Sequence, residues 1–236
     1  MAQLTSIIIA NIGAGKSALL NTFKKKREKS PLLDSTSIVK ELRVEEEDPK
    51  VLEIVENKFI PALKEGDENK LFFAEMDILK ARFDQYHRIM RENGIWFLER
   101  SIYEDRFVFV EYLAQKGYLS PDHFEDYTAV FEHRLKSIIP PNIIIYLYTD
   151  PAVAFERIKK RGREYEKNYT LEYITELHNY YEKMVRKELP AIIKNFDERF
   201  LPPINVNENF DAKDLEGFHN NIELELERQL RIRGFL

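Results

Sequence analysis

The chain has 236 residues, of which 44% are hydrophobic and 33% are charged, and its formal net charge is −5. This length and apolar content fit one α/β domain over residues 1–236 better than two domains. The negative charge argues against a nucleic-acid-binding surface, which is normally basic, and the lack of cysteine excludes disulfides, thiolate metal sites and cysteine nucleophiles.

The sequence also bears on membranes and targeting. No apolar run approaches the roughly 20 residues that a membrane-spanning helix requires. The first predicted strand begins by about residue 4, so no signal or transit peptide fits before it. We therefore expect a cytoplasmic protein that binds neither a membrane nor nucleic acid.

The first predicted element, residues 4–10, is a β-branched apolar strand that leads into a glycine-rich loop. The loop residues expected to hold phosphate are Asn11, Ile12, Gly13, Ala14, Gly15, Lys16 and Ser17. Ala10 stands where the phosphate-loop spacing usually has its first glycine. The backbone N–H groups of such a loop, with the helix predicted over 16–28, form an anion site. Lys16 can reach the β- and γ-phosphates of a nucleotide, and the Ser17 hydroxyl can ligate Mg²⁺.

Strands and helices alternate along the rest of the chain, as the hydrophobic periodicity indicates. The predicted strands are 35–40, 95–99, 142–148 and 204–206, and the predicted helices are 51–64, 71–92, 103–116, 121–138, 151–161, 170–188 and 212–232. Residues 43–70 are acidic and weakly patterned, so we expect loops on both sides of the helix there. The alternation predicts a P-loop NTPase-type fold, with a parallel five-stranded sheet covered by helices on both faces. Ligands of such sheets bind at the carboxyl ends of the strands.

Charged residues that could handle phosphate follow two of these strands. Glu99 ends the strand 95–99, where a carboxylate can hold Mg²⁺ or can be an ordinary polar strand end. A basic cluster follows the strand 142–148 and its helix: Arg157, Lys159, Lys160, Arg161 and Arg163. Its arginines could close over phosphates as a lid, about residues 161–169, or the cluster could only complement the dipole of the helix C-terminus.

Four parts of the chain together resemble the deoxynucleoside kinases, the family of deoxycytidine, deoxyguanosine and deoxyadenosine kinases. They are the phosphate loop 11–17, the acid-Arg-Ser segment 99–106, the arginine-rich segment 157–166, and the pair 171–173 and 206–210. The resemblance covers most of the chain and is weakest over 43–70. The combination of the acid-Arg-Ser segment and the lid is far more specific than the phosphate loop alone.

The resemblance implies catalytic roles for three residues, Glu41, Arg100 and Lys16. Glu41 would be the general base that accepts the proton of the sugar 5′-hydroxyl, although Leu42 stands where the family usually has proline. Arg100 would hold the 5′-oxygen and the transferring phosphate. The chain would then use ATP with Mg²⁺ to make a deoxynucleoside 5′-monophosphate, and it would be a homodimer through helices near 71–138.

The resemblance also implies the binding residues. Ser17 and Glu99 would hold Mg²⁺, and Glu166 would accept a hydrogen bond from the sugar 3′-hydroxyl. Besides the phosphate loop, the residues expected to bind ATP are Arg157, Arg161, Arg163, Glu208 and Phe210.

Base recognition is where the sequence departs from the family. Glu75 occupies the position at which most members have a base-reading glutamine, and Arg82 and Asp105 match the arginine–aspartate pair of the deoxycytidine and purine kinases. A carboxylate only accepts hydrogen bonds, and guanine presents two adjacent donors. We therefore predict a purine preference, with deoxyguanosine before deoxyadenosine. Glu75 could instead lie one helical turn away or pair with Arg82.

Two other functions remain open from the sequence. A nucleoside monophosphate kinase shares the loop and an arginine lid, but a carboxylate base would oppose its anionic acceptor. A non-catalytic, kinase-like structural subunit could keep the fold after losing catalysis. Ala10, Leu42 and Glu75 favour this second reading, and the presence of Lys16 together with Arg100 argues against it.

Overall fold

Five parallel strands form one sheet in the order β2-β3-β1-β4-β5 within the part of the chain that the structure describes. This computed structural model describes residues 3–26, 42–92, 94–194, 204–207, 224, 228–229 and 231–232. The strands are β1 Gln3–Ala10, β2 Leu42–Glu45, β3 Gly94–Leu98, β4 Ile143–Tyr148 and β5 Ile204–Asn207. The α/β fold with a parallel sheet that the sequence predicts is confirmed.

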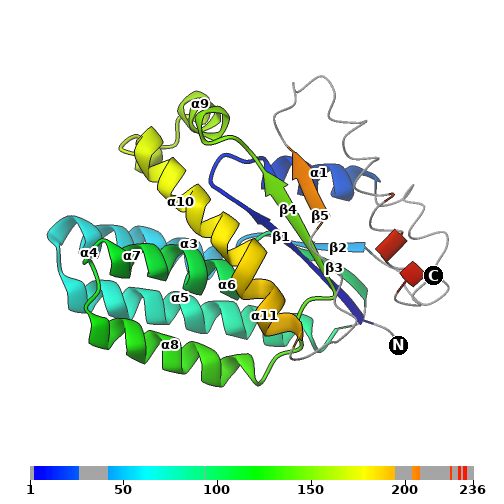
Figure 1. The fold of residues 1–236 in the computed structure, drawn as a ribbon, viewed down its shortest axis with the longest axis horizontal. Helices are drawn as coiled ribbons and strands as arrows, with labels where there is room; N and C mark the ends of the chain where they lie inside the picture. Colours follow the sequence, from blue (N-terminus) through cyan, green and yellow to red (C-terminus); the bar gives the residue numbers. More distant parts are fainter. Residues whose placement is uncertain are drawn as a thin grey trace.

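Helices link the strands and cover the sheet (Figure 1). The α-helices are α1 Lys16–Lys26, α3 Pro49–Ile54, α4 Ile60–Glu65, α5 Glu68–Ile89, α6 Ile102–Glu104, α7 Glu111–Gln115, α8 Pro121–Leu135, α9 Pro151–Arg161, α10 Leu171–Lys183 and α11 Leu189–Lys194. Wider π-helical turns are η2 Val55–Phe59, η3 Asp105–Val110 and η5 Met184–Glu188, and η4 Glu164–Glu166 is a short 3-10 helix. In Figure 1, α5 and α8 run side by side, and α10 crosses the molecule from α9 towards the sheet.

The centre of the sheet is built from β-branched residues. Ile7, Ile8 and Ile9 of β1 are fully buried, and Ile7 is in register with Leu98 of β3 and Ile144 of β4. Burial on both faces explains why the second half of β1, from Ile7 to Ala10, is continuously apolar rather than alternating. Because the strands are parallel, their carboxyl ends meet at one edge, where the phosphate loop follows Ala10.

One strand lies where the sequence analysis expected a loop. The predicted strand 35–40 is outside the described residues, whereas β2 occupies Leu42–Glu45 and pairs with β3, with Val44 opposite Phe97. The expectation of a loop at the start of 43–70 was therefore wrong. A four-residue edge strand of alternating apolar and charged residues has too short a pattern to be distinguished from its surroundings.

Two predicted helices contain π-helical turns next to proline. The predicted helix 51–64 is present as α3, η2 and α4, and the predicted helix 170–188 continues through η5 into α11. Pro61 and Pro190 lie just beyond η2 and η5. A proline ring clashes with the carbonyl four residues before it, and a widened turn makes room for the ring. The chain therefore bends at these points without leaving the helix.

The remaining expectations concern the last helix and the surface. Of the predicted helix 212–232, residues 224, 228–229 and 231–232 are described and are helical.

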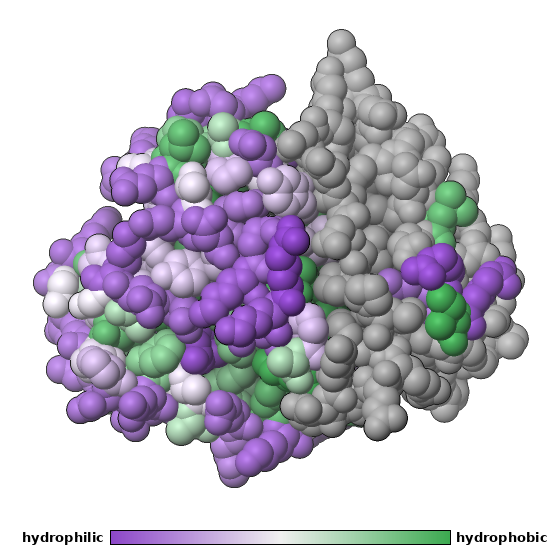
Figure 2. Space-filling view, viewed as in Figure 1, coloured by the Kyte–Doolittle hydropathy of each residue, from purple (hydrophilic) through white to green (hydrophobic). Residues whose placement is uncertain are grey.

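Figure 2 shows a face on which hydrophilic residues predominate and hydrophobic ones form small separate groups. None of the helices that the structure describes has the length and apolar character needed to cross a membrane.

Candidate active site

The phosphate loop closes tightly between β1 and α1. Gly13 and Gly15 have φ angles of 81° and 103°, which side chains rarely adopt. The side chain of Asn11 holds the turn, because its Oδ1 accepts from the Ile12 N–H at 2.8 Å and its Nδ2 donates to the Ile174 carbonyl at 2.9 Å. Ala10 keeps a negative φ, so alanine is compatible with the backbone at this position.

Gly13 is required by space as well as by backbone angle. A Cβ at this position would lie 2.5 Å from the carbonyl oxygen of Ala154 in α9. We expect Gly13→Ala to lower the melting temperature by several degrees and to weaken ATP binding, because overpacking of about 1–3 kcal/mol adds to the left-handed backbone penalty. Gly117→Ala is the matched control, since Gly117 has a φ of 73° but no atom within 4 Å of its Cβ position. Equal losses in melting temperature for the two variants would contradict the steric argument.

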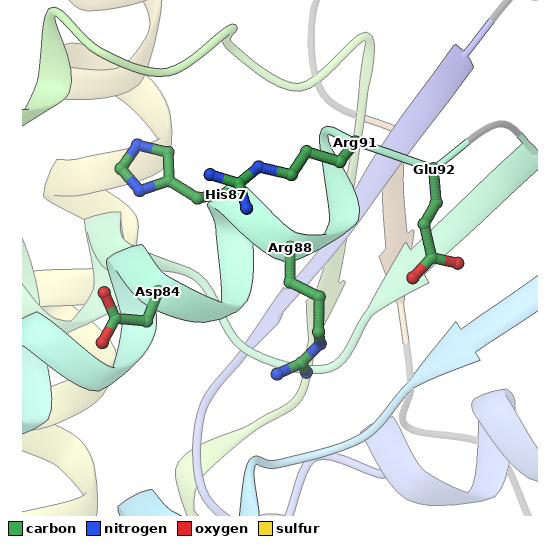
Figure 3. Close-up of a pocket in the computed structure, with 5 residues that line it drawn as sticks. All are labelled: Asp84, His87, Arg88, Arg91 and Glu92. Carbon is green, nitrogen blue, oxygen red and sulfur yellow. The ribbon is translucent and has the colours of Figure 1, made fainter.

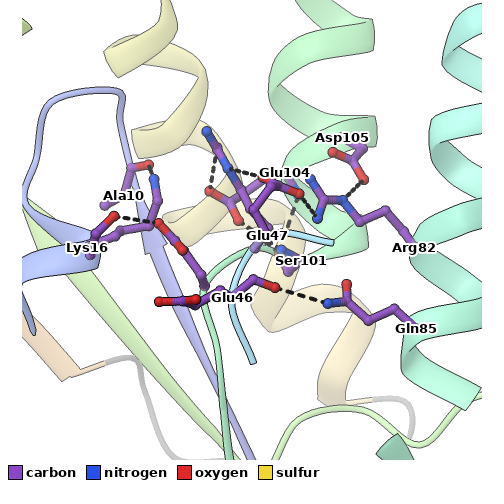
Figure 4. A network of polar contacts seen from close by, with 12 residues as sticks. Ala10, Lys16, Glu46, Glu47, Arg82, Gln85, Ser101, Glu104 and Asp105 are labelled. Atoms are coloured by element: carbon purple, nitrogen blue, oxygen red, sulfur yellow. Dashed lines mark hydrogen bonds and ion pairs between the residues drawn. The ribbon is translucent and has the colours of Figure 1, made fainter. Parts of the chain in front are cut away.

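Lys16 is the buried cation of the loop. Its Nζ donates to the carbonyl oxygen of Ala10, and its side chain is largely buried (Figure 4). Burial, reinforced by the nearby Arg100, lowers the pKa of Lys16 to about 7. A buried ammonium next to another cation is stabilised by an anion, so the loop is electrostatically prepared for phosphate.

Ser17 and Glu99 meet at the ends of α1 and β3. The Ser17 hydroxyl donates to Glu99 Oε1 at 2.7 Å. Mg²⁺ prefers oxygen ligands and usually keeps several waters, binding to one or two protein oxygens and to substrate phosphates. The hydroxyl and carboxylate are therefore oxygen donors of the kind that Mg²⁺ prefers.

A carboxylate that the sequence analysis missed, Glu47, lies beside these groups. It lies two residues after the end of β2, forms an ion pair with Arg82, and has its Oε2 3.4 Å from Arg100 Nε. Burial alone would raise its pKa, but Arg82, Arg100 and Lys16 together hold the pKa of Glu47 below its ordinary value. Glu41, the predicted base, lies outside the described residues. Glu47 is therefore one of the carboxylates, together with Glu99 and Glu104, that the structure brings close to Lys16.

Arg100 is held by a network of buried groups. Its Nη1 contacts Tyr181 Oη at 3.2 Å and Glu104 Oε1 at 3.4 Å, and Tyr181 also donates to Glu104 at 3.0 Å. Glu104 is fully buried and completes a capping box with Ser101, whose N–H it accepts at 3.0 Å. The acid-Arg-Ser segment therefore starts the helix α6, and Glu104 of this helix contacts both Ser101 and the Arg100 guanidinium.

Arg82 and Asp105 form the ion pair that the sequence predicts. Arg82 Nε lies 3.2 Å from Asp105 Oδ2, and both side chains are nearly fully buried. Arg82 also pairs with Glu47. Glu75 lies near this cluster on the same helix, but it forms no ion pair with Arg82. The alternative in which Arg82 neutralises Glu75 directly is therefore wrong.

The basic segment after α9 is organised around Glu166. Arg161 donates to both carboxylate oxygens of Glu166, at 3.0 and 2.6 Å, and Arg163 Nη1 lies 3.8 Å from the same group. Arg157 reaches back to the phosphate loop, where its Nη1 is 3.5 Å from the Ala14 carbonyl. Arg161 is thus paired with a buried carboxylate, and Arg157 of α9 contacts the phosphate loop.

A sequence profile of the deoxynucleoside kinases matches residues 7–216. The chain belongs to the deoxynucleoside kinase family. The match includes the phosphate loop, the acid-Arg-Ser segment and the lid, so the family resemblance predicted from these motifs is confirmed.

Curated relatives carry several substrate names. Deoxyadenosine kinase of Dictyostelium discoideum is 29% identical over 154 residues, which cover 64% of this chain and 62% of that protein. Deoxycytidine kinase 2 of Gallus gallus is 33% identical over 123 residues, or 50% of this chain and 46% of the relative. Deoxyadenosine/deoxycytidine kinase of Bacillus subtilis is 29% identical over 180 residues, or 75% of each chain. The chain thus spans less than two thirds of two of these three relatives.

The predicted site residues of this deoxynucleoside kinase family member fall into two groups. Among those described, Arg82, Arg100 and Asp105 are linked by contacts through Glu47, and Arg161, Arg163 and Glu166 form a second group. Glu41, Glu208 and Phe210 lie outside the described residues. Phe109 also lies against the site, since its ring centroid is 5.3 Å from the Arg100 guanidinium carbon.

A hollow elsewhere on the molecule is separate from this site. It has a volume of about 430 Å³ and is lined by Asp84, His87, Arg88, Arg91 and Glu92 near the end of α5 (Figure 3). It shares no residue with the group around Glu47, and its lining mixes both signs of charge.

Proposed function

We propose that the chain transfers the γ-phosphoryl group of ATP to the 5′-hydroxyl of a deoxynucleoside. The observation that carries the proposal is the ionised carboxylate of Glu47, which contacts Arg100 and lies within electrostatic reach of Lys16. An acceptor base beside two phosphate-binding cations is the arrangement that phosphoryl transfer to a hydroxyl needs.

The proton and the bonds balance as follows. Glu47 takes the proton of the 5′-hydroxyl while the 5′-oxygen bonds to the γ-phosphorus. The bond between the γ-phosphorus and its bridging oxygen breaks, and ADP leaves. Lys16 and Arg100 stabilise the negative charge on the transferring group. Mg²⁺, when bound to Ser17 and Glu99, would supply further charge neutralisation on the phosphates.

The remaining proposed roles are phosphate binding by the arginines and binding of the acceptor's sugar and base. Arg157, Arg161 and Arg163 would hold phosphate oxygens, and Glu166 would accept from the 3′-hydroxyl. Glu166 can do so while it pairs with Arg161, because a carboxylate has about four acceptor sites. We propose a purine acceptor, with deoxyguanosine preferred when Glu75 is ionised.

The part of the site where the acceptor would bind, around Glu47, Asp105 and Glu75, is unfavourable for a nucleoside monophosphate. Glu47, Asp105 and Glu75 bring three carboxyl groups to it, and the cations Arg82 and Arg100 are already paired with acids. An acceptor phosphate would need a free cation there, since an unpaired anion close to carboxylates is repelled. A neutral nucleoside fits this charge balance better.

The test is to incubate the protein with ATP–Mg²⁺ and each deoxynucleoside, following ADP release and the monophosphate product. We expect turnover on purine deoxynucleosides and little on thymidine. Turnover only on monophosphates would overturn the proposal in favour of a monophosphate kinase. ATP binding without turnover on either class would favour the non-catalytic subunit.

We also propose that the chain acts as one domain, as a homodimer and in the cytoplasm. The single sheet supports the first point, and Phe73, which is 64% exposed on α5, gives one of the predicted interface helices an apolar contact. The molar mass in solution tests the dimer.

A further inference from the structure

The guanidinium of Arg100 is held through two of its nitrogens. Nε lies 3.4 Å from Glu47 Oε2, and Nη1 lies 3.2 Å from Tyr181 Oη and 3.4 Å from Glu104 Oε1. Among the described residues no side chain or backbone group contacts Nη2. Because a guanidinium is planar and rigid, contacts at two corners fix the position of the third. The free corner, Nη2, is therefore fixed in place without being used.

Glu104 and Tyr181 form one of the two anchors. The Tyr181 hydroxyl donates to Glu104 Oε1 at 3.0 Å and accepts from Arg100 with a lone pair, so both of its functions are used. Glu104 Oε2 accepts from the N–H and the Oγ of Ser101, at 3.0 and 3.3 Å. Glu104 and Tyr181 are both fully buried. This anchor is thus a rigid cluster in the protein interior, in which each contact donates to the carboxylate.

The other anchor, Glu47, changes its charge in the proposed reaction. When Glu47 takes the proton of the 5′-hydroxyl, it becomes a neutral carboxyl group, which attracts a guanidinium far less than a carboxylate does. Glu104 receives no proton in that step and contacts a different nitrogen of Arg100. The contacts of Nη1 therefore persist while the negative charge at Nε disappears.

The helix α10 links this anchor to the phosphate loop. Tyr181 lies near the carboxyl end of α10, and the carbonyl of Ile174 on the same helix accepts from Asn11 Nδ2 of the loop at 2.9 Å. About two turns of helix, or about 10 Å, separate Ile174 from Tyr181. One rigid element therefore contacts both the loop that would bind the donor and the arginine that would meet the transferring group.

We propose that Tyr181 and Glu104 are positioning residues for Arg100, which keep its Nη2 available to the transferring phosphoryl group while Glu47 becomes neutral. The proposal rests on the proposed kinase function. Neither residue touches the reacting atoms, so both act through the guanidinium. Lys16 lies within electrostatic reach of Arg100 and Glu104, which places this group of residues beside the phosphate loop.

The first experiment measures the steady-state kinetics of Tyr181→Phe, which removes one oxygen and keeps the buried ring. We expect kcat and kcat/KM for a deoxynucleoside to fall together by about tenfold, because a displaced guanidinium weakens a contact made in the transition state. The KM values for the deoxynucleoside and for ATP should stay within about twofold of those of the wild type.

Tyr146→Phe is the matched control. Tyr146 of β4 is also buried, and its hydroxyl donates to Glu182 Oε1 at 2.7 Å, at the residue that follows Tyr181 on α10. The control thus breaks a second tyrosine–glutamate hydrogen bond to the same helix, one that does not contact Arg100. Both variants should lower the melting temperature, but Tyr146→Phe should change kcat by less than about twofold.

A second background separates positioning from a purely structural role. Arg100→Met removes the group through which Tyr181 would act, so adding Tyr181→Phe to it should cause no further loss of kcat/KM. A tyrosine that only stabilises the fold would lower kcat/KM by the same factor in both backgrounds. Glu104→Gln removes the charge of the anchor, and we expect it to lower kcat at least as much as Tyr181→Phe does. If one of these two single variants did not fold, the other would decide.

The outcomes distinguish this inference from the proposed function. An unchanged kcat in Tyr181→Phe, or an equal loss with and without Arg100, would overturn the positioning role and leave the kinase intact. A higher KM for the deoxynucleoside at unchanged kcat would also overturn it, since the hydroxyl would then serve substrate binding. No turnover of any deoxynucleoside by the wild type would overturn the proposed function and this inference with it.

Discussion

Replacing Glu47 by glutamine is expected to lower kcat by about 10²–10⁴-fold, which is the usual contribution of a general base. Glutamine keeps the size and one acceptor oxygen of the side chain but cannot take a proton at neutral pH. The fold should survive, because Arg82 keeps Asp105 and Arg100 keeps Glu104 as partners. The measurement is steady-state phosphorylation of a deoxynucleoside, with the melting temperature as the check on folding.

Two further variants, Glu46→Gln and Glu41→Gln, test whether the expected loss of kcat is specific to Glu47. Glu46 is the exposed neighbour of Glu47, and its backbone carbonyl accepts a hydrogen bond from Gln85 Nε2 at 3.2 Å. We therefore expect near-normal kcat for Glu46→Gln. Glu41→Gln tests the base predicted from sequence: if it lost activity while Glu47→Gln kept it, the assignment to Glu47 would be wrong.

The ionisation of Glu47 adds a pH criterion. Because Arg82, Arg100 and Lys16 hold its pKa below the ordinary value, Glu47 stays a carboxylate to a lower pH than an ordinary glutamate does. Loss of activity due to its protonation should therefore begin only below that range. An acid limb at higher pH in the wild type that persists in Glu75→Gln would point to a different base.

The phosphate loop could be predicted because its determinants are local. The apolar run before Ala10 and the glycines that follow specify the strand, the turn and the helix within a few residues. The helix α5 was predicted for a similar reason, although it begins at Glu68 because the Asp67 side chain caps it by accepting from the Lys70 N–H at 3.0 Å. Caps and periodicity are properties of short segments.

The position of Glu47 could not be predicted because it depends on contacts distant in sequence. Its partners Arg82 and Arg100 come from α5 and from the end of β3. One local signal was available, since Asp48 followed by Pro49 is typical of a helix start and does cap α3. A helix start at Pro49 implies that the preceding strand ends a few residues earlier, as β2 does at Glu45. The carboxylate at the end of that strand would then be sought after Glu45 and not at Glu41.

The ion pairs of Arg82 also depend on contacts distant in sequence, so they could not be predicted either. The sequence allowed it to neutralise Glu75, seven positions earlier on one helix, which helical spacing makes plausible. The structure gives both of its contacts to Glu47 and Asp105 instead. Glu47 enters from another segment, so the charge state of Glu75 follows from tertiary contacts and not from the helix alone.

Arg100→Met is expected to lower kcat/KM by about 10³-fold, since a cation on the transferring phosphoryl group contributes this much in related chemistry. The guanidinium contacts Glu47, Glu104 and Tyr181 at once, so its position is fixed before substrate binds. Arg100→Lys keeps the charge but not the planar fork, and we expect an intermediate loss of about 10²-fold. Both values come from initial rates at varied deoxynucleoside concentration.

Arg106→Met is the matched control for a structural arginine in the same segment. Arg106 pairs with Glu111 at 2.8 Å and stacks on Phe124, away from the phosphate loop. It should lower the melting temperature while changing kcat/KM only a few-fold. Arg100→Met should also lower the melting temperature, because Glu104 loses its cation and keeps only the donors from Ser101 and Tyr181. If the two variants lost activity in proportion to their loss of stability, Arg100 would be a structural residue and the mechanism would lose its second cation.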